Sequence, residues 1–352
     1  MFGQKKPSLL GIDISSSVVK MLELGQVNGK YSVESYAVEP LPLNSVIEGR
    51  IDNVEEVAGA IRRALKKSGA KAKDAAVAVS ANSAITKVIS FPSDMSEREM
   101  EEQIRHEAEN YIPYPLQEVS LDFEVIGPSA TDPDAVDVLL AASRSENVDA
   151  RTDAIEAAGL KLKLVDVEAY SIENAFVLIR EQMPNHGQGL AVAVLEVGSS
   201  VTTLHVLVDG KIVFTREQTF GGRMLTEEIE RHYGMSYQEA GLAKKQNNLP
   251  QDYKEKVLEP FKRSMTTTVT RALQFFFSAS TQYQSIDYIV LAGGCASIQG
   301  MASMIEEETG TPTSVANPFS DMILGSKIKI QSLSNDAPSM LIACGLAMRS
   351  FD

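Results

Sequence analysis

Cysteine is scarce in this 352-residue chain, and tryptophan is absent. The two cysteines, Cys295 and Cys344, lie among small apolar residues, so we expect reduced, packed thiols and a reducing compartment instead of a disulfide framework. With four histidines and no Cys-x-x-Cys or His-x-x-x-His spacing, the chain lacks the ligands of a zinc site. Any metal would therefore be held by oxygen atoms.

Long apolar runs are also missing. No stretch approaches the roughly 18 residues of a membrane-spanning helix, and Met1 to Pro7 has Lys5 and Lys6 but no apolar signal core behind it. We therefore expect no membrane span and a cytoplasmic location.

Basic residues are outnumbered, with 33 Lys and Arg against 47 Asp and Glu, which gives a formal net charge of −14. A chain of this charge would repel a phosphate backbone, so we expect no nucleic-acid binding. The acidic surface keeps the protein soluble and suits basic peptide partners.

The hydrophobic content of 44% is enough for two or more globular units. The chain opens with a buried strand at 9–14, a second strand at 17–24 and a hairpin turn at Asn28-Gly29. A helix over 54–66 follows, with Asn53 as its cap. This order of elements predicts an α/β fold.

The pattern of apolar and polar residues changes near residue 84. Short strands follow, together with a helix capped by Ser96 and Glu99 and a proline-bracketed segment at 111–115. These features predict a small inserted subdomain over residues 84–164.

Residues 190–220 repeat the opening of the chain: apolar strand, carboxylate, small residues, second strand, turn and third strand. Aligned without gaps, Asp13 to Val18 lies over Glu196 to Val201. We therefore predict a duplicated chain. Its parts are a first domain of residues 1–83, 165–188 and 336–352, the insert 84–164, and a second domain of residues 189–335.

Each repeat places a carboxylate at the end of a strand, before a turn of Gly and Ser residues. Such a turn presents N–H and hydroxyl groups to phosphate oxygens. Asp13 and Glu196 would face each other across a cleft and either hold a hydrated Mg²⁺ or orient an attacking water. A polar hairpin tip is the simpler alternative for one turn, but the duplicated pair favours a site. The predicted phosphate contacts are Ser15, Ser16, Ser17, Gly198, Ser199 and Ser200.

The chain has neither a G-x-x-x-x-G-K-S/T stretch nor a G-x-G-x-x-G after a strand, so a nucleotide site would be of another type. Gly293-Gly294 follows a buried strand and would permit close approach by a flat ligand such as adenine. Gly221-Gly222 precedes a helix and allows the same reading. A bare Gly-Gly pair is usually only a turn, so both readings stay open.

Three stretches together resemble the actin, Hsp70 and sugar-kinase superfamily. Residues 10–18 resemble its first phosphate motif, 195–203 its second, and 289–300 its adenosine motif. The resemblance implies an actin-like (ribonuclease H-like) fold with ATP and Mg²⁺ in a central cleft. It adds Lys20, Lys244 and Ile298 to the nucleotide contacts. A solvated surface lysine is an equally good interpretation of Lys244.

Within this superfamily the whole chain is similar to the FtsA-like PilM family of type IV pilus assembly proteins. The supporting stretches are residues 239–245, 274–277, 316–319 and 343–352. The resemblance implies an FtsA-type insert and a groove beside it for the cytoplasmic N-terminus of PilN. It also implies indirect contact with PilO, PilP and the pilus motor ATPases, recruitment to the inner membrane through a partner, and a role in pilus biogenesis and twitching motility.

Two positions depart from the family pattern. Glu196 stands where Asp is usual, and its extra methylene moves the carboxylate by roughly one bond length, which disturbs an in-line water. We therefore expect ATP binding with at most slow hydrolysis. Gly241 stands where FtsA relatives usually have Glu, which weakens the case for Lys244.

Other readings stay open. Tyr111, Tyr114 and Phe91 are candidate groove residues, but core packing explains each of them equally well. A filament-forming ATPase, which would self-associate, is an alternative function. A small-molecule kinase is a weaker one, because no Asp at a strand end clearly serves as its catalytic residue.

Overall fold

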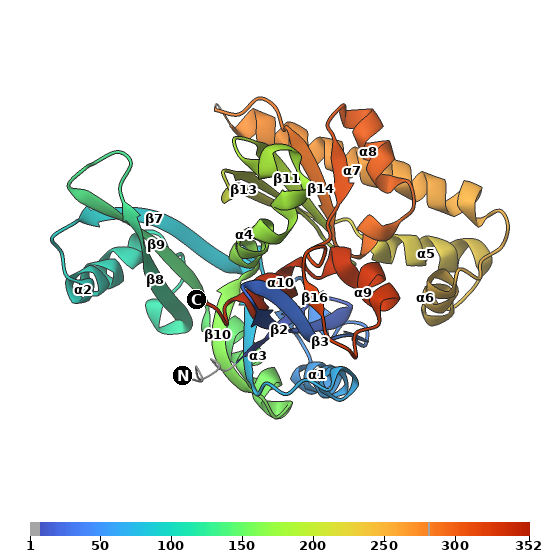
Figure 1. Cartoon of the computed structure of the whole chain (residues 1–352), viewed down its shortest axis with the longest axis horizontal. Helices are drawn as coiled ribbons and strands as arrows, with labels where there is room; N and C mark the ends of the chain where they lie inside the picture. The colour runs from blue at the N-terminus through green and yellow to red at the C-terminus, as the bar shows by residue number, and fades with distance from the viewer. Residues whose placement is uncertain (1–7, 281) are drawn as a thin grey trace.

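Strands β1, β2 and β3 form an antiparallel meander in the computed structural model, which describes residues 8–280 and 282–352 (Figure 1). The segment Met1 to Pro7, for which the sequence predicts no signal core, lies outside these residues. Two parallel strands, β6 and β10, and the short β16 complete a six-stranded sheet in the order β10-β6-β1-β2-β3-β16. The bounds are β1 Leu9–Ile14, β2 Val18–Val27, β3 Lys30–Pro40, β6 Asp74–Val79, β10 Lys161–Val167 and β16 Ile323–Leu324.

A second sheet repeats this arrangement in the order β13-β12-β11-β14-β15. Here too a three-stranded meander is extended by a strand parallel to its first member. The paired positions correspond as well, because Asp13 pairs with Lys20 and Glu196 pairs with Thr203. The predicted duplication is therefore confirmed. The bounds are β11 Ala191–Val197, β12 Thr202–Val208, β13 Lys211–Gln218, β14 Tyr288–Ala292 and β15 Thr313–Val315.

Helices α4 (Glu168–Ile179) and α10 (Leu341–Met348) lie between the two sheets (Figure 1). One continuous apolar core joins their buried side chains to those of both sheets. Small residues make this close packing possible: a Cβ on Gly345 of α10 would lie 1.8 Å from the carbonyl oxygen of Ser171 on α4. The two domains therefore share a core and do not pack as separate units.

The outer face of each sheet carries its own helices. On the first sheet these are α1 (Val54–Ser68), capped by Asn53 and ended at Gly69 with φ +65°, and α3 (Ser145–Ala157). The second sheet is covered by α5 (Gly222–Tyr233), α7 (Glu259–Ala279) and α8 (Met301–Thr309). Helix α6 (Tyr237–Gln246) packs beside α5, and a π-helical turn at Lys254–Leu258 leads into α7.

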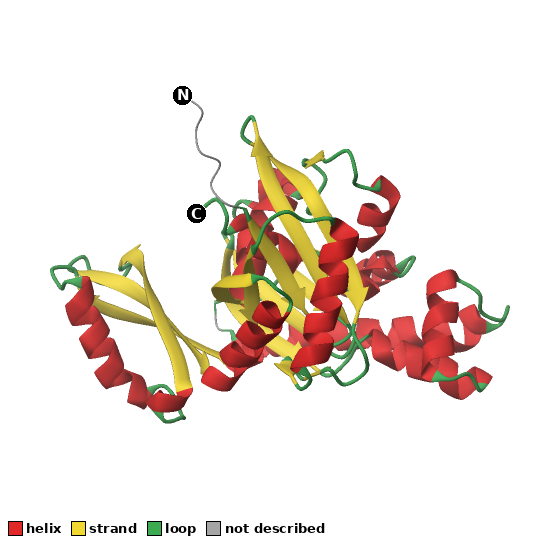
Figure 2. Cartoon of the chain, turned by 90° about the horizontal axis from the view of Figure 1, so that it is seen from below, coloured by secondary structure: helices red, strands yellow, loops and turns green. Residues whose placement is uncertain are grey.

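The insert stands to one side as a three-stranded sheet in the order β7-β9-β8, with α2 on one of its faces (Figure 2). Its bounds are β7 Ala84–Pro92, α2 Glu97–Glu107, β8 Val119–Pro128 and β9 Ala135–Arg144. Two small apolar clusters form its interior.

The sequence predicts that the insert ends at residue 164, whereas the last strand of its sheet, β9, ends at Arg144. Helix α3 packs on α1 through Ile155, and β10 pairs with β6, so both belong to the first domain. Strand β16, drawn from the sequence into the second domain, pairs with β3 of the first sheet. Within the described residues, no helix is long and apolar enough to cross a membrane.

Candidate functional site

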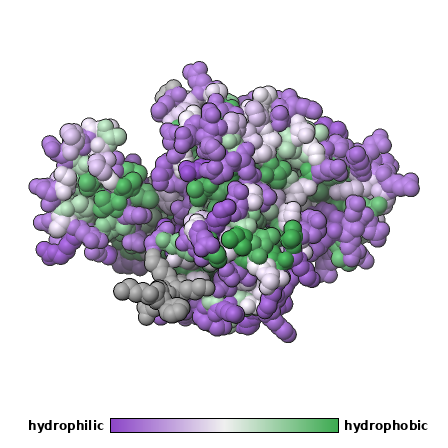
Figure 3. Space-filling view, viewed as in Figure 1, coloured by the Kyte–Doolittle hydropathy of each residue, from purple (hydrophilic) through white to green (hydrophobic). Residues whose placement is uncertain are grey.

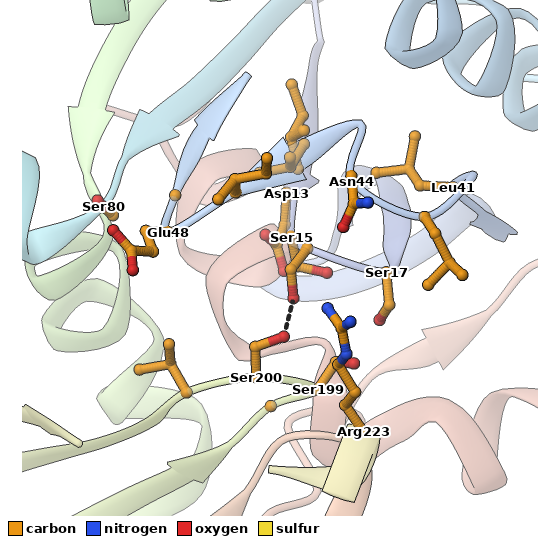
Figure 4. Close-up of a pocket in the computed structure, with 18 of the residues that line it drawn as sticks. Asp13, Ser15, Ser17, Leu41, Asn44, Glu48, Ser80, Ser199, Ser200 and Arg223 are labelled. Atoms are coloured by element: carbon orange, nitrogen blue, oxygen red, sulfur yellow. Dashed lines mark hydrogen bonds between the residues drawn. The ribbon is translucent and has the colours of Figure 1, made fainter. Parts of the chain in front are cut away.

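The two repeated turns lie against each other where the domains meet. Each is closed by the same bond: the N–H of Ser15 donates to the Val18 carbonyl at 3.1 Å, and the N–H of Gly198 donates to the Val201 carbonyl at 2.9 Å. The Ser16 hydroxyl lies 3.4 Å from the Ser200 hydroxyl, marked by the dashed line in Figure 4. Residues 184 positions apart thus meet because the duplication places equivalent turns face to face.

A cavity of about 560 Å³ opens beside these turns. Both domains contribute to its walls: the two turns, the segment 41–49 of the first domain, and the starts of α4, α5 and α6. Of the predicted residues, those lining it are Asp13, Ser15, Ser16, Ser17, Glu196, Gly198, Ser199 and Ser200.

Asp13 is 3% exposed and forms an ion pair of 2.6 Å with the equally buried Lys20. Burial alone would lower the pKa of Lys20, but the charges of Asp13 and Glu196 outweigh it and hold the pKa above its ordinary value. Lys20 lies behind Asp13 and does not line the cavity. Its ammonium donates to Oδ2 of Asp13, and Asp13 itself lines the cavity.

Glu168, the first residue of α4, also lines the cavity, a position that sequence reasoning missed. Burial, with added repulsion from Asp13 and Glu196, raises the pKa of Glu168 to about 8. Burial also raises the pKa of Glu196 to about 7, with Lys20 opposing and Asp13 adding to the shift. A cation entering the cavity would displace these protons, because positive charge favours the ionised carboxylates.

No group of three or more His, Cys, Asp or Glu in the described part of the chain is arranged to hold a metal ion. Asp13 and Glu196 remain as a pair, with one oxygen of Asp13 already bonded to Lys20. Such a pair fits Mg²⁺, which keeps several waters and takes its other ligands from substrate phosphates. The residues present therefore suit a hydrated ion brought in with a phosphate ligand.

None of the four paired glycines lines the cavity, and three of them, Gly221, Gly222 and Gly293, contact the second turn or the end of its strand. A Cβ on Gly221 would lie 2.4 Å from the Ser199 carbonyl oxygen, and one on Gly293 would lie 2.4 Å from that of Val197. Gly222 donates its N–H to the Gly198 carbonyl at 3.0 Å, while Gly294 is exposed. Ile298 lines a separate cavity of about 350 Å³ next to the start of α8.

Lys244 on α6 is half-buried and bonded within the fold. Its ammonium donates to the Thr226 hydroxyl at 2.6 Å and to the Gly222 carbonyl at 3.3 Å. Burial lowers the pKa of Lys244. It therefore differs from a solvated surface lysine, although it does not line the cavity, whose α6 wall is Tyr237, Gln238 and Gly241.

Arg223 and the segment 41–49 line the cavity and were also missed. In Figure 4 the Arg223 side chain points from the second domain toward Ser15 and Ser17 of the first. The one sequence signal for Arg223 is its place directly after Gly221-Gly222, at the start of a helix. Segment 41–49 had no signal, since its turn contacts the site only through the tertiary fold.

Polar groups also gather where the first domain meets the insert. Asp166 of β10 is buried, and its Oδ2 has an ion-pair distance of 3.4 Å to Arg349 Nε but no hydrogen bond. Burial raises the pKa of Asp166, Arg349 opposes this, and Glu124 of β8 is one of the charges that adds to it. Tyr170 of α4 lies against Thr86 of β7.

The insert surface exposes apolar side chains, which gather on it in Figure 3. Val88 of β7 and Ile126 of β8 are 51% and 55% exposed. Of the three aromatic groove candidates, Phe91 is buried in the insert core, Tyr114 lies under the guanidinium of Arg144, and Tyr111 is exposed.

A family model and a solved structure both relate this chain to type IV pilus assembly proteins. The family model described as "Type IV pilus assembly protein PilM" matches residues 11–351. A solved "PilM-PilN type IV pilus biogenesis complex" contains a chain 27% identical to this one, with a TM-score of 0.80 and 99% of both chains covered.

Two more distant structures bear on the fold alone. The ethanolamine utilization protein EutJ from Carboxydothermus hydrogenoformans is 15% identical, with a TM-score of 0.57 over 97% of this chain and 89% of that chain. MreB 5 of Spiroplasma citri, solved bound to AMPPNP, is 13% identical, with a TM-score of 0.50 over 99% and 97%. These likenesses confirm the predicted actin-like α/β fold.

Proposed function

Because this chain belongs to the family of the type IV pilus assembly protein PilM, we propose that it is a cytoplasmic scaffold of a pilus assembly platform that binds ATP with Mg²⁺ between its domains. One observation carries the nucleotide part: equivalent small-residue turns from both domains border a single cavity. The MreB relative is bound to an ATP analogue. The 27% identical relative is part of a PilM-PilN complex.

The ligand's phosphates would be bound by N–H and hydroxyl groups of the two turns, 15–17 and 198–200. Asp13 and Glu196 would hold the hydrated Mg²⁺, which neutralises phosphate charge when bound. Lys20 orients Asp13 for that role through its 2.6 Å ion pair. Because the longer side chain of Glu196 displaces its carboxylate from the position that would orient an in-line water, we propose a binding site with at most slow ATPase activity.

The partner we propose is the cytoplasmic N-terminus of PilN, held between the insert and the first-domain edge strand β10. Strand β10 ends the first sheet and leaves one edge without a neighbouring strand in the described fold. Asp166, whose buried Oδ2 has an ion pair with Arg349 but no hydrogen bond, lies at this junction together with the charge of Glu124. A basic, extended peptide would satisfy both features.

Recruitment to the inner membrane would follow from that peptide, and contact with PilO, PilP and the motor ATPases would be indirect. The role in pilus biogenesis and twitching motility belongs to the same proposal. It predicts that deletion of the gene abolishes twitching and that the intact protein restores it.

Isothermal titration tests both sites on the full chain. We expect the protein to bind ATP only weakly without Mg²⁺ and more tightly with it, and Asp13→Ala to lose that dependence. A peptide of the PilN N-terminus should bind with or without nucleotide, and Asp166→Asn should weaken it while leaving ATP affinity unchanged. The exposed Asp149→Asn on α3 is the matched control. Absence of ATP binding would refute the nucleotide part, and absence of peptide binding would refute the scaffold part.

A further inference from the structure

The cavity between the domains has an unfavourable charge balance for a polyphosphate. Its lining includes the carboxylates of Asp13, Glu48, Glu168, Glu196 and Glu217. Among the described lining residues, Arg223 is the one with a cationic side chain. We propose that Arg223 binds the phosphate chain of the nucleotide and links the two domains across it, an inference that rests on the proposed ATP-binding function.

The position of Arg223 is fixed by the backbone of the second turn. Its N–H donates to the Ser199 carbonyl at 2.8 Å, next to the 3.0 Å bond from the Gly222 N–H to Gly198. The close contact of Gly221 with Ser199 leaves no room for a Cβ. The start of α5 is therefore held against the turn that would bind phosphate.

These backbone bonds also decide which part of α5 can reach a ligand. A helix N-terminus normally offers its free N–H groups to an anion. Here the N–H groups of Gly222 and Arg223 are already bonded to the turn. Of the described α5 residues, Arg223 is the one that lines the cavity, so its side chain is the donor that this helix presents there.

The direction of that side chain agrees with this role. In Figure 4 it extends across the cleft toward Ser15, Ser17 and Asn44 of the first domain. Glu227, one turn further along α5, accepts from Nε at 2.8 Å, which orients the guanidinium and leaves its two Nη groups for a ligand. A guanidinium can bind two phosphate oxygens at once with parallel hydrogen bonds.

A phosphate bound at Arg223 would also affect how the two domains are held together. Ser15–Ser17 belongs to the first domain and Arg223 to the second, so a phosphate bound by both would connect the domains. Adenosine has no phosphate and would not make this connection. Arg223 should therefore contribute to the affinity for ATP and not to that for adenosine.

Affinity measurements on Arg223→Gln and Arg223→Lys test this. We expect Arg223→Gln to weaken Mg-ATP binding about 10- to 100-fold, the range for a lost hydrogen bond to a charged group. Arg223→Lys should lose less, because it keeps the charge but not the paired donors. Adenosine affinity, measured by ligand-observed NMR, should stay within about twofold of wild type in both variants.

Arg231→Gln is the matched control, since Arg231 lies on the same helix with a similar ion pair to Glu228 and is remote from the cavity lining. It should bind ATP like wild type. Wild-type ATP affinity in Arg223→Gln, or an equal loss of ATP and adenosine affinity in a variant that melts normally, would overturn the inference alone. Failure of the wild-type protein to bind ATP would overturn the proposed function as well.

Discussion

At the start of α4, Glu168 shares the cavity wall with Asp13 and Glu196, and its ionisation depends on the fold. Burial first, then these two carboxylates, raise its pKa from 4.5 to about 8, while Arg151 opposes the shift. In the unfolded chain Glu168 loses its proton near the ordinary value. Between about pH 5 and 8 the folded state therefore holds a proton that the unfolded state has released.

The sign of the stability change follows directly. The free energy of unfolding decreases with rising pH wherever the folded state binds more protons than the unfolded state. The raised pKa of Glu168 therefore stabilises the folded protein fully below about pH 4.5. This contribution is lost as the pH rises toward 8. Glu168→Gln mimics the protonated form at every pH. We expect it to reduce the fall in unfolding free energy between pH 5 and 8 by on the order of 1–3 kcal/mol.

Urea denaturation of the ligand-free protein at pH 5 and pH 8 measures this. Glu307→Gln, at an exposed carboxylate on α8, is the control and should follow the wild-type pH dependence. An unchanged pH dependence in Glu168→Gln would show that Glu168 is ionised in the folded protein at neutral pH.

Residues such as Glu168 mark the limit of sequence reasoning about the site. Asp13, Glu196 and the small-residue turns are predictable, because each repeat carries the pattern within six residues. Glu168, Arg223 and the segment 41–49 reach the same cavity only through tertiary packing. The Gly221-Gly222 and Gly293-Gly294 pairs signal close backbone contact, but a sequence does not say that the contact is with the neighbouring turn.

At the scale of elements, two glycines inside helices differ in the space around them, so we expect their replacement by alanine to have opposite effects on stability. A Cβ on Gly345 of α10 would lie 1.8 Å from the Ser171 carbonyl oxygen on α4, so the helices would have to separate. On α1, a Cβ on Gly59 would meet only the flexible side chains of Arg62 and Arg63, at 3.5 Å or more. Both residues lie inside helices, so the difference between them is packing alone.

We expect Gly345→Ala to destabilise the protein by about 3 kcal/mol or more, because overpacking at a backbone contact has no flexible neighbour to absorb it. Gly59→Ala should stabilise it by about 0.5–1 kcal/mol through helix propensity. Thermal denaturation of the two variants side by side checks both signs. A neutral Gly345→Ala would mean that α4 and α10 can move apart at little cost.

Arg151 of α3 connects three elements near the cavity. It is 1% exposed, and its guanidinium donates to the carbonyls of Ala78 on β6, Asn147 on α3 and Gly49 in the turn between β4 (Val46–Ile47) and β5 (Arg50–Ile51). Gly49 itself lines the cavity. Arg151 therefore joins the segment 41–49 to the helix that follows the insert.

Arg151→Met would remove the guanidinium donor from all three carbonyls, of which Asn147 keeps its helical N–H bond. We expect a loss of about 3 kcal/mol in unfolding free energy, since each buried carbonyl left unsatisfied costs roughly 1–3 kcal/mol and water relieves part of it. ATP affinity should fall as well, because Gly49 loses its anchor. Arg98→Met, at an exposed ion pair on α2, should change stability by less than about 0.5 kcal/mol. Equal stabilities of the two variants would contradict this role.

Some element boundaries can be predicted from the local sequence, whereas others depend on tertiary pairing. The strand at 9–14 and the cap of α1 at Asn53 follow from local pattern and agree with the structure. The end of the insert does not, because α3 and β10 are assigned to the first domain by their partners α1 and β6. A sequence read alone carries no information on which partner a strand will find.

For the whole molecule, the distribution of cores predicts where the chain opens first. The two main domains share one apolar core through α4 and α10, so they should unfold together. The insert relies on two small clusters of its own, with five and three buried residues. Few buried contacts imply a low free energy of local opening.

Hydrogen exchange of the full chain, with and without ligands, tests this arrangement. Amides of β7, β8 and β9 should exchange faster than those of β1, β6 and β11 in the free protein. Mg-ATP should slow exchange in the turns 15–17 and 198–200 and at the start of α5, since a ligand that binds only the folded state protects the groups it contacts. A PilN peptide should instead slow exchange in the insert and β10. Protection that spreads equally over the insert with ATP alone would mean that nucleotide binding orders the peptide groove, and protection of neither region by its ligand would place both binding sites elsewhere on the molecule.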